Sequence, residues 1–264
     1  MKLGYDVIGD IVIFKFDYNL SEKEKRDIAF KFFEEHKNVR TALEKTDKIK
    51  GRLRIAKTRF ILGVDKRETV HIENGCRFKL NIDETYFSPR LSNQRQEVAS
   101  DIVKKVNRKK NKILVLFAGV GPFSIVVAKK LKLAGKKALI VSNELNRKAC
   151  QYACENVRIN KVEDYVNVVQ GDAKKIAVKL KKLNLPLKYD FVIMPRPNLK
   201  DTFLKEMGRM ANKGAKFYYH GFGKKEEVVR EIKNSKIKIN NFKMKKAGDI
   251  GPYKNRWMVE FNKK

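Results

Sequence analysis

Short apolar runs alternate with amphipathic stretches through the second half of the chain. The first run, 112–117, has the length and composition of a strand buried on both faces. Gly119 and Gly121 follow it, and Pro122 suits the first position of a helix, where its missing N–H costs nothing. This order predicts a nucleotide or adenosyl-cofactor site at the carboxyl end of a strand. A plain tight turn is the alternative for the G-x-G motif alone.

The strand–helix pattern repeats after this motif. Further strands are predicted at 138–141, 165–169, 189–194 and 215–220, helices at 147–160, 199–211 and 224–234, and a final antiparallel pair at 236–246 and 255–261. Residues 112–264 are therefore expected to form one α/β domain with a mostly parallel, Rossmann-like, seven-stranded sheet.

The first 83 residues follow a different pattern, which predicts a small α+β domain. A strand is expected at 7–16, a helix capped near Ser21, and another candidate strand at 52–62. Two alternating runs, 69–73 and 76–82, flank Asn74-Gly75 and predict a hairpin. Residues 84–111 are predicted to be a connecting loop and helix.

The net charge of the chain indicates what kind of partner it binds. The chain has 61 Lys and Arg against 30 Asp and Glu, a formal net charge of +31. A lysine-rich proteome adapted to heat would enrich both signs, whereas this one-sided excess favours a polyanion such as RNA. A solvated outer face is the alternative for the basic strands. The candidate RNA-binding residues are Arg52, Lys57, Arg59, Arg77, Lys79 and Arg95.

Other classes of protein are not indicated. The three cysteines and three histidines show no metal-ligand spacing, so no metal is predicted. The sequence has no signal peptide and no apolar run near the roughly 18 residues that a membrane span needs. A soluble, cytoplasmic protein that does not bind membranes is expected, and we expect it to be a monomer.

Acidic residues at two further strand ends narrow the choice of cofactor. Glu144 follows the second strand, where a ribose hydroxyl is held in doubly wound folds, and Asp172 follows the third, where it can accept from an adenine amine. With the G-x-G turn, they describe an S-adenosylmethionine pocket better than a nicotinamide one. The candidate cofactor-binding residues are Tyr86, Arg90, Phe117, Gly119, Val120, Gly121, Phe123, Glu144, Leu145, Asp172 and Ala173.

Several motifs together resemble one family. The segments 8–13, 71–75, 86–91, 117–125 and 155–160 are similar to those of the archaeal and eukaryotic tRNA (guanine-37-N1)-methyltransferases and their wybutosine-pathway relatives. The resemblance implies a class I S-adenosylmethionine-dependent methyltransferase domain behind a small RNA-contacting domain. It implies the anticodon stem-loop of tRNA as partner. The additional amino-terminal domain that grips the tRNA elbow in many members is expected to be absent.

The resemblance also supplies catalytic candidates. Arg54 resembles the arginine that stabilises the guanine, and Gln94 stands where the family has a glutamate that serves as general base. A glutamine cannot accept a proton at neutral pH, so Glu97, another group or water is required. Pro195, Arg196 and Pro197 replace the family's Asn-Leu-Pro, and Val115 replaces an acid.

Three functions follow as hypotheses. The first is methylation of N1 of guanine 37 in tRNA, with a wyosine precursor at the same position as a further substrate. The second is transfer of an aminocarboxypropyl group from the same cofactor. The third is a non-catalytic tRNA-binding protein, motivated by Gln94 and Val115.

Overall fold

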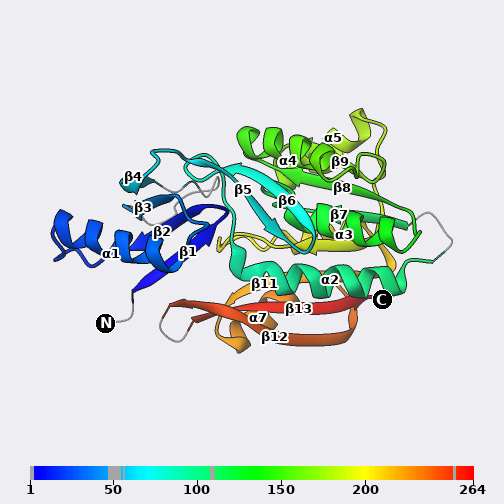
Figure 1. Cartoon of the computed structure of the whole chain (residues 1–264). Helices are drawn as coiled ribbons and strands as arrows, with labels where there is room; N and C mark the ends of the chain where they lie inside the picture. Colours follow the sequence, from blue (N-terminus) through cyan, green and yellow to red (C-terminus); the bar gives the residue numbers. More distant parts are fainter. Residues whose placement is uncertain (1–2, 47–54, 56, 108–110, 252–253) are drawn as a thin grey trace.

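A computed structural model of the chain describes residues 3–46, 55, 57–107, 111–251 and 254–264 (Figure 1). Its strands are β1 (Gly4–Ile8), β2 (Ile11–Lys15), β3 (Thr41–Lys45), β4 (Thr58–Gly63), β5 (Glu68–Glu73), β6 (Cys76–Asn81), β7 (Asn111–Val115), β8 (Ala138–Glu144), β9 (Val166–Gln170), β10 (Tyr189–Met194), β11 (Ala211–Gly223), β12 (Ile239–Gly251) and β13 (Lys254–Lys263). Its α-helices are α1 (Glu22–Glu35), α2 (Ser92–Lys105), α3 (Pro122–Leu133), α4 (Arg147–Ile159), α5 (Ile176–Lys182), α6 (Leu204–Met210) and α7 (Lys225–Asn234).

The large sheet has seven strands in the order β12-β13-β11-β10-β7-β8-β9. The strands from β11 to β9 pair in parallel, while β13 pairs antiparallel with both β11 and β12. This order confirms the predicted mostly parallel sheet and its terminal antiparallel pair. The first strand of the repeat, β7, lies between β10 and β8 and runs parallel to both, so its carboxyl end meets those of β8 and β10.

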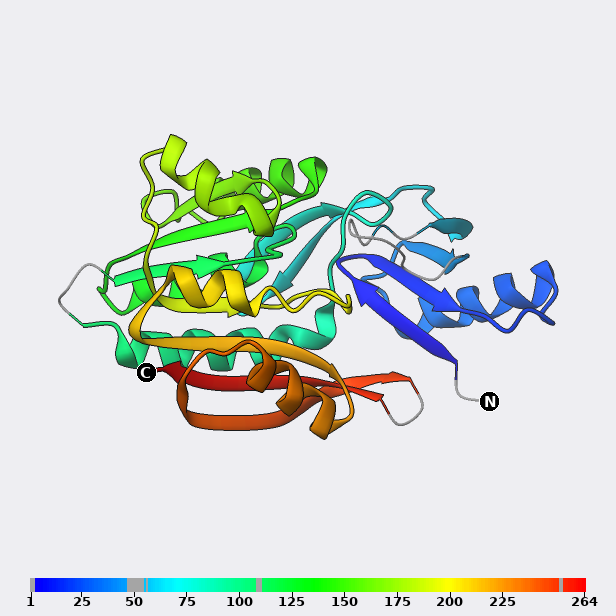
Figure 2. The same ribbon diagram turned by 180° about the vertical axis from the view of Figure 1, so that it is seen from behind.

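Helices cover both faces of this sheet, which explains the unbroken apolar runs. Ile113 and Val115 of β7 pack toward α2, α3 and α4, whereas Leu114 and Leu116 pack toward α5, α6 and α7. The two helical layers are seen from opposite sides in Figures 1 and 2. Central parallel strands must be apolar on both faces because crossover helices cover both.

The amino-terminal unit forms a four-stranded sheet in the order β1-β2-β3-β4, covered by α1. Its core includes Phe14 from the sheet and Phe32 from the helix. Helix α1 begins as predicted at Ser21, whose Oγ accepts from the Glu24 backbone while the Glu24 carboxylate accepts from the Ser21 backbone. Such a reciprocal capping box satisfies two otherwise unpaired helix-end donors.

The sequence-based elements differ from the structure at three places. The expected strand 7–16 is a hairpin, because Gly9 adopts φ +59° and its position leaves no room for a Cβ beside Thr69 Oγ1. Strand β3 was not predicted; it pairs in parallel with β2, a non-local contact that periodicity does not reveal. The helix expected at 199–211 begins only at Leu204.

The β5–β6 hairpin packs against the large domain, although the sequence grouped it with the first 83 residues. Cys76, Phe78 and Leu80 are fully buried in the same core as α3 and α4. The side chain of Asn156 on α4 accepts from the Lys79 backbone N–H at 2.7 Å and donates to its carbonyl at 3.0 Å. Asn160 makes the equivalent pair of bonds with Arg77. These two asparagines therefore join the hairpin to α4.

We expect Asn156→Ala to lower the free energy of unfolding by about 2 kcal/mol, because it leaves a buried backbone N–H and carbonyl unpaired. Asn156 is fully buried and also donates to the Val120 carbonyl at 3.1 Å. Urea unfolding measures the change. The matched control, Asn167→Ala at an exposed position of β9, should stay within about 0.5 kcal/mol of the native chain. Equal losses in both variants would contradict this role.

Candidate active site

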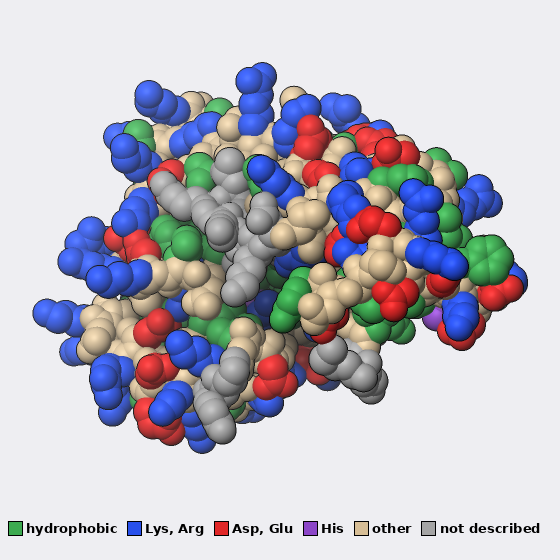
Figure 3. Space-filling view, turned by 90° about the vertical axis from the view of Figure 1, so that its left-hand side faces the viewer, with side chains coloured by type: hydrophobic (Ala, Val, Ile, Leu, Met, Phe, Trp, Pro, Cys, Tyr) green, Lys and Arg blue, Asp and Glu red, His purple; other side chains and the backbone are tan. Residues whose placement is uncertain are grey.

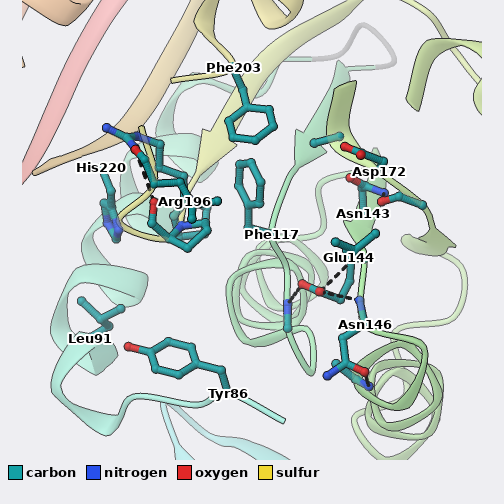
Figure 4. A pocket seen from close by; sticks show the side chains of 18 of the residues that line it. Tyr86, Leu91, Phe117, Asn143, Glu144, Asn146, Asp172, Arg196, Phe203 and His220 are labelled. Carbon is teal, nitrogen blue, oxygen red and sulfur yellow. Dashed lines mark hydrogen bonds between the residues drawn. The ribbon is translucent and has the colours of Figure 1, made fainter. Parts of the chain in front are cut away.

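The main pocket lies at the carboxyl ends of β7, β8, β9 and β10. It holds about 840 Å³ of empty space, a volume that includes its opening to solvent. Figure 4 shows Glu144 and Asp172 on one side of Phe117, and Arg196 and His220 on the other. The pocket is lined by residues that include Tyr86, Leu91, Phe117, Gly119, Glu144, Leu145, Asp172, Ala173, Pro195, Arg196, Pro197, His220, Phe222 and Arg256.

The turn after β7 has an unusual backbone that shapes the pocket floor. Phe117 and Gly119 adopt positive φ values of 52° and 56°, and Gly121 follows at 90° as the N-cap of α3. A side chain at Gly119 would stand 3.2 Å from the Tyr86 carbonyl oxygen. Strained backbone of this kind persists where the surrounding structure holds it, and it directs the Gly119 N–H toward the Glu144 carboxylate.

Glu144 organises the adjoining loops. Its Oε2 accepts from the Gly119 N–H at 2.8 Å, and its Oε1 accepts from the N–H groups of Leu145 and Asn146, each at 2.8 Å. Burial raises the pKa of the Glu144 carboxyl, and the three backbone donors oppose that rise. The carboxylate is thereby fixed at the edge of the pocket, where a ligand hydroxyl can donate to it.

The end of β9 is fixed by Asn143. Its Nδ2 donates to the carbonyls of Val169 at 3.0 Å and Gly171 at 2.9 Å. Asp172 follows, and its Oδ1 accepts from the Lys174 N–H at 3.0 Å. Asp172 and Ala173 therefore line the pocket next to Glu144, as the sequence predicted for neighbouring parallel strand ends.

The loop after β10 places Pro195, Arg196 and Pro197 on the opposite side of the pocket. Arg196 is only 2% exposed. Its Nη2 donates to both oxygens of Glu231, at 3.0 and 2.9 Å, and its Nε donates to the Tyr219 hydroxyl. Arg196 was a catalytic candidate as part of the segment that replaces Asn-Leu-Pro, and its charge is already neutralised by Glu231.

Gln94 lies beneath the pocket rather than in its lining. The Gln94 Oε1 lies 2.7 Å from His220 Nε2, so it accepts from the Nε2–H tautomer of that imidazole. Glu97 lies one turn along α2, where its exposed carboxylate pairs with Lys245 and does not line the pocket. The structure therefore separates Glu97 from the site and connects Gln94 to it through His220.

Sequence reasoning missed His220, because a single histidine at the end of a strand carries no spacing signal. His220 is 2% exposed and lines the pocket. Nδ1 of His220 forms no hydrogen bond with the described residues. Every fully buried polar side-chain atom of these residues does have a partner, so Nδ1 is not fully buried. Nδ1 therefore opens onto the pocket, where it offers a lone pair. Burial, with Arg256, Arg196 and Arg95 nearby, lowers the pKa of His220 to about 3.

This lowered pKa predicts a pH dependence of stability. Below the ordinary pKa of 6.5 the unfolded chain binds a proton at this position while the folded chain does not, so stability is lost as pH falls toward about 3. We expect the native chain to lose up to about 1.4 kcal/mol per pH unit in this window relative to His220→Asn. Urea unfolding at pH 7, 5 and 4 measures this difference. Parallel pH profiles for the two proteins would contradict the prediction.

Four cofactor-binding candidates lie outside the pocket lining. Val120 and Phe123 are buried in the core, and Gly121 caps α3. Arg90 is exposed, and its Nε donates to Asp6 Oδ1 at 2.6 Å. Arg90 instead lines a second cavity between the amino-terminal unit and the β12–β13 hairpin.

The RNA-binding candidates divide into paired and unpaired cations. Arg59 pairs with Glu22 and Glu44, and Lys79 pairs with Glu68 and Glu155. Lys57 and Arg77 are exposed and form no ion pair within the described chain. Arg52 and the catalytic candidate Arg54 lie outside the described residues. Lys and Arg side chains are nevertheless spread widely over the face shown in Figure 3.

Arg95 does not face solvent and belongs to a buried network. It is 1% exposed, and its guanidinium donates to both carboxylate oxygens of Glu73 at 2.5 Å. His71 lies 3.7 Å from the same carboxylate, and its Nδ1 accepts from the Gly9 N–H. A buried pair of this kind cannot bind a phosphate without exposing Glu73, so Arg95 instead links α2, the hairpin and the amino-terminal unit.

Among the described residues, no helix is long and apolar enough to cross a membrane. The same part of the chain contains no cluster of three or more His, Cys, Asp or Glu residues that could hold a metal ion.

The strand order, the glycine turn and the acid-bearing ends of β8 and β9 define a Rossmann-like, S-adenosylmethionine-dependent methyltransferase. Residues 69–246 match the TRM5/TYW2 methyltransferase domain, and residues 1–66 match the TYW2 N-terminal domain. The chain therefore belongs to the TRM5/TYW2 methyltransferase family.

Individual relatives agree with this assignment. The chain is 34% identical to tRNA (guanine(37)-N(1))-methyltransferase Trm5b of Pyrococcus abyssi, over 89% of this chain and 66% of that protein. It is 31% identical to tRNA (guanine(37)-N(1))/4-demethylwyosine(37)-methyltransferase Taw22 of Nanoarchaeum equitans, over 96% of this chain and 97% of that protein.

Solved structures share the fold along the whole chain. The crystal structure of Trm5b from Pyrococcus abyssi superposes with a TM-score of 0.79 at 30% identity, covering 98% of this chain and 74% of that one. A complex of aTrm5 and tRNALeu gives a TM-score of 0.83 at 25% identity, covering 100% of this chain and 72% of that one.

Proposed function

We propose that this protein transfers the methyl group of S-adenosylmethionine to N1 of guanosine at position 37 of tRNA, next to the anticodon. The observation that carries the proposal is the two-sided pocket, with an acid-bearing side formed by Glu144 and Asp172 and a second side formed by the 195–197 loop and His220. One side suits the cofactor and the other suits a nucleobase.

The residues present fit the cofactor. Gly119 leaves space that a Cβ would occupy, Glu144 has an acceptor for the ribose hydroxyls, and Phe117, Leu145 and Ala173 supply apolar contact. Asp172 is the candidate acceptor for the adenine amine. When bound, S-adenosylmethionine supplies an electrophilic methyl group, whose bond to sulfur breaks as the bond to N1 forms.

The chain must also accept the proton on guanine N1. Gln94 cannot accept it at neutral pH, Glu97 lies outside the pocket, and the Glu144 carboxylate faces the cofactor side. We therefore assign the acceptor role to Nδ1 of His220, with Gln94 fixing the tautomer through Nε2–H. Because the His220 imidazole is a weak base, it is unprotonated at neutral pH and its Nδ1 lone pair is available. The proton on guanine N1 becomes more acidic as the bond between N1 and the methyl group forms.

A second function is favoured by the amino-terminal match. Residues 1–66 match the TYW2 N-terminal domain, and the chain is 28% identical to a tRNA(Phe) (4-demethylwyosine(37)-C(7)) aminocarboxypropyltransferase of Methanocaldococcus jannaschii. The name of the Nanoarchaeum equitans relative includes both guanosine and 4-demethylwyosine at position 37. Methylation of that wyosine precursor and aminocarboxypropyl transfer are thus the alternatives.

One experiment separates these activities. The protein is incubated with tRNA carrying either guanosine or 4-demethylwyosine at position 37, and with S-adenosylmethionine labelled on the methyl or on the carboxyl carbon. Mass spectrometry should find methyl label on 1-methylguanosine. Carboxyl label on the nucleoside would establish the aminocarboxypropyl reaction, and tight RNA binding with no label from either carbon would leave only a binding function.

A further inference from the structure

The second cavity adjoins the proposed active site. It lies between the amino-terminal unit and the β12–β13 hairpin, and its lining includes Ile13, Lys15, Phe87 and Asp249. Tyr86 and Arg256 line both this cavity and the main pocket. A nucleotide whose base occupies the main pocket therefore has its sugar and phosphates near these two residues.

Arg256 differs from the other pocket arginine in its charge balance. Both guanidinium groups lie over the Phe222 ring, Arg196 at 5.3 Å and Arg256 at 5.8 Å from its centroid. Arg196 is neutralised by Glu231. Within the described part of the chain, the Arg256 guanidinium forms no ion pair and no hydrogen bond. Its five donors are thus available to a ligand.

The charges around the second cavity also favour an anion. Its lining holds four cationic side chains, Lys15, Lys45, Arg90 and Arg256, and two carboxylates, Asp6 and Asp249. Asp6 already pairs with Arg90, and Asp249 already pairs with Lys246. No carboxylate of the lining remains to compensate Arg256, so its field extends into the cavity.

We propose that Arg256 binds a phosphate group flanking the nucleotide that is methylated, and thereby holds that nucleotide with its base in the main pocket. A guanidinium recognises phosphate through two parallel N–H···O bonds, and the Phe222 ring fixes its orientation. This assignment rests on the proposed function, because it takes the target nucleotide of tRNA as the ligand. Neutralising Arg256 on binding also removes one of the cations that weaken His220 as a base.

The test combines a protein variant with a single change in the RNA. Full-length tRNA is assembled by ligation with one neutral methylphosphonate at either the 5′ or the 3′ phosphate of nucleotide 37. We expect Arg256→Gln to weaken tRNA binding about tenfold. One of the two methylphosphonates should weaken binding to the native chain about as much and should add little to the loss in Arg256→Gln.

Arg158→Gln is the matched control, since it removes the same charge from an exposed position of α4 that lines neither cavity. It should change binding by less than about twofold, and Arg256→Lys should retain part of the affinity. Additive losses at both phosphates, or equal losses in Arg158→Gln and Arg256→Gln, would overturn the assignment. Methylation by the native chain is measured separately, and its absence would refute the proposed function. If methylation occurs but the effects of Arg256→Gln and of the methylphosphonate are independent, only the role of Arg256 is refuted.

Discussion

His220→Asn should lower kcat for methylation of guanosine 37 by about 100-fold, because general-base assistance of this kind contributes at least that much. Asparagine keeps a polar group that can bond to Gln94 but offers no ring nitrogen to accept the proton. The affinity for S-adenosylmethionine should stay nearly unchanged, since His220 lies on the side of the pocket away from Glu144. Single-turnover kinetics and calorimetry measure the two quantities.

Two further variants identify the acceptor. Gln94→Glu places a carboxylate within about 3 Å of His220 Nε2–H, which raises the basicity of the imidazole, so the rate should hold or rise. Glu97→Gln removes only a surface ion pair with Lys245. A large loss of rate in Glu97→Gln, with His220→Asn remaining active, would transfer the role of proton acceptor to Glu97.

Glu144→Gln should weaken S-adenosylmethionine binding about 100-fold while the chain stays folded. The carboxylate accepts from three backbone N–H groups, and a glutamine would set its own NH₂ donor against at least one of them. It would also lose the charge-assisted bond to a ribose hydroxyl, which is stronger than a neutral one. Calorimetry measures the affinity, and thermal melting confirms the fold.

The control is Glu163→Gln, at an exposed position just before β9, which should bind the cofactor like the native chain. If Glu144→Gln unfolds, Glu144→Asp keeps the charge but withdraws the oxygens by one methylene and should still bind more weakly. Native affinity in a folded Glu144→Gln would remove Glu144 from the cofactor site.

The grouping of Gly119, Glu144 and Asp172 in one pocket could be predicted from the sequence because these residues lie at strand ends. Parallel strands bring their carboxyl ends to one edge, so the order of apolar runs already places Gly119, Glu144 and Asp172 together. The hairpin was equally predictable, since Asn74-Gly75 and the alternation around it are local signals. The contact of that hairpin with α4 was not, because it depends on Asn156 and Asn160, far along the chain.

Ion pairs between residues far apart in the sequence explain why several arginines that the sequence offered as site residues are not free to bind a ligand. Arg95, Arg59 and Arg196 look alike in the sequence as cations available to RNA or base. Their partners Glu73, Glu44 and Glu231 lie 15 to 35 residues away along the chain, and only the folded chain brings them together. Arg256 shows the converse, as a cation with no carboxylate partner among the described residues.

The sequence alone therefore determined the sheet, the glycine turn after β7 and the basic character of the protein, since strand periodicity, glycine geometry and composition are local or additive properties. The tertiary structure decided which polar groups face the pocket. His220 and Arg256 line the pocket from β11 and β13, and Gln94 of α2 contacts His220 from beneath, so their positions depend on how these elements pack. Burial and neighbouring charges then set the basicity of His220, which no single stretch of sequence encodes.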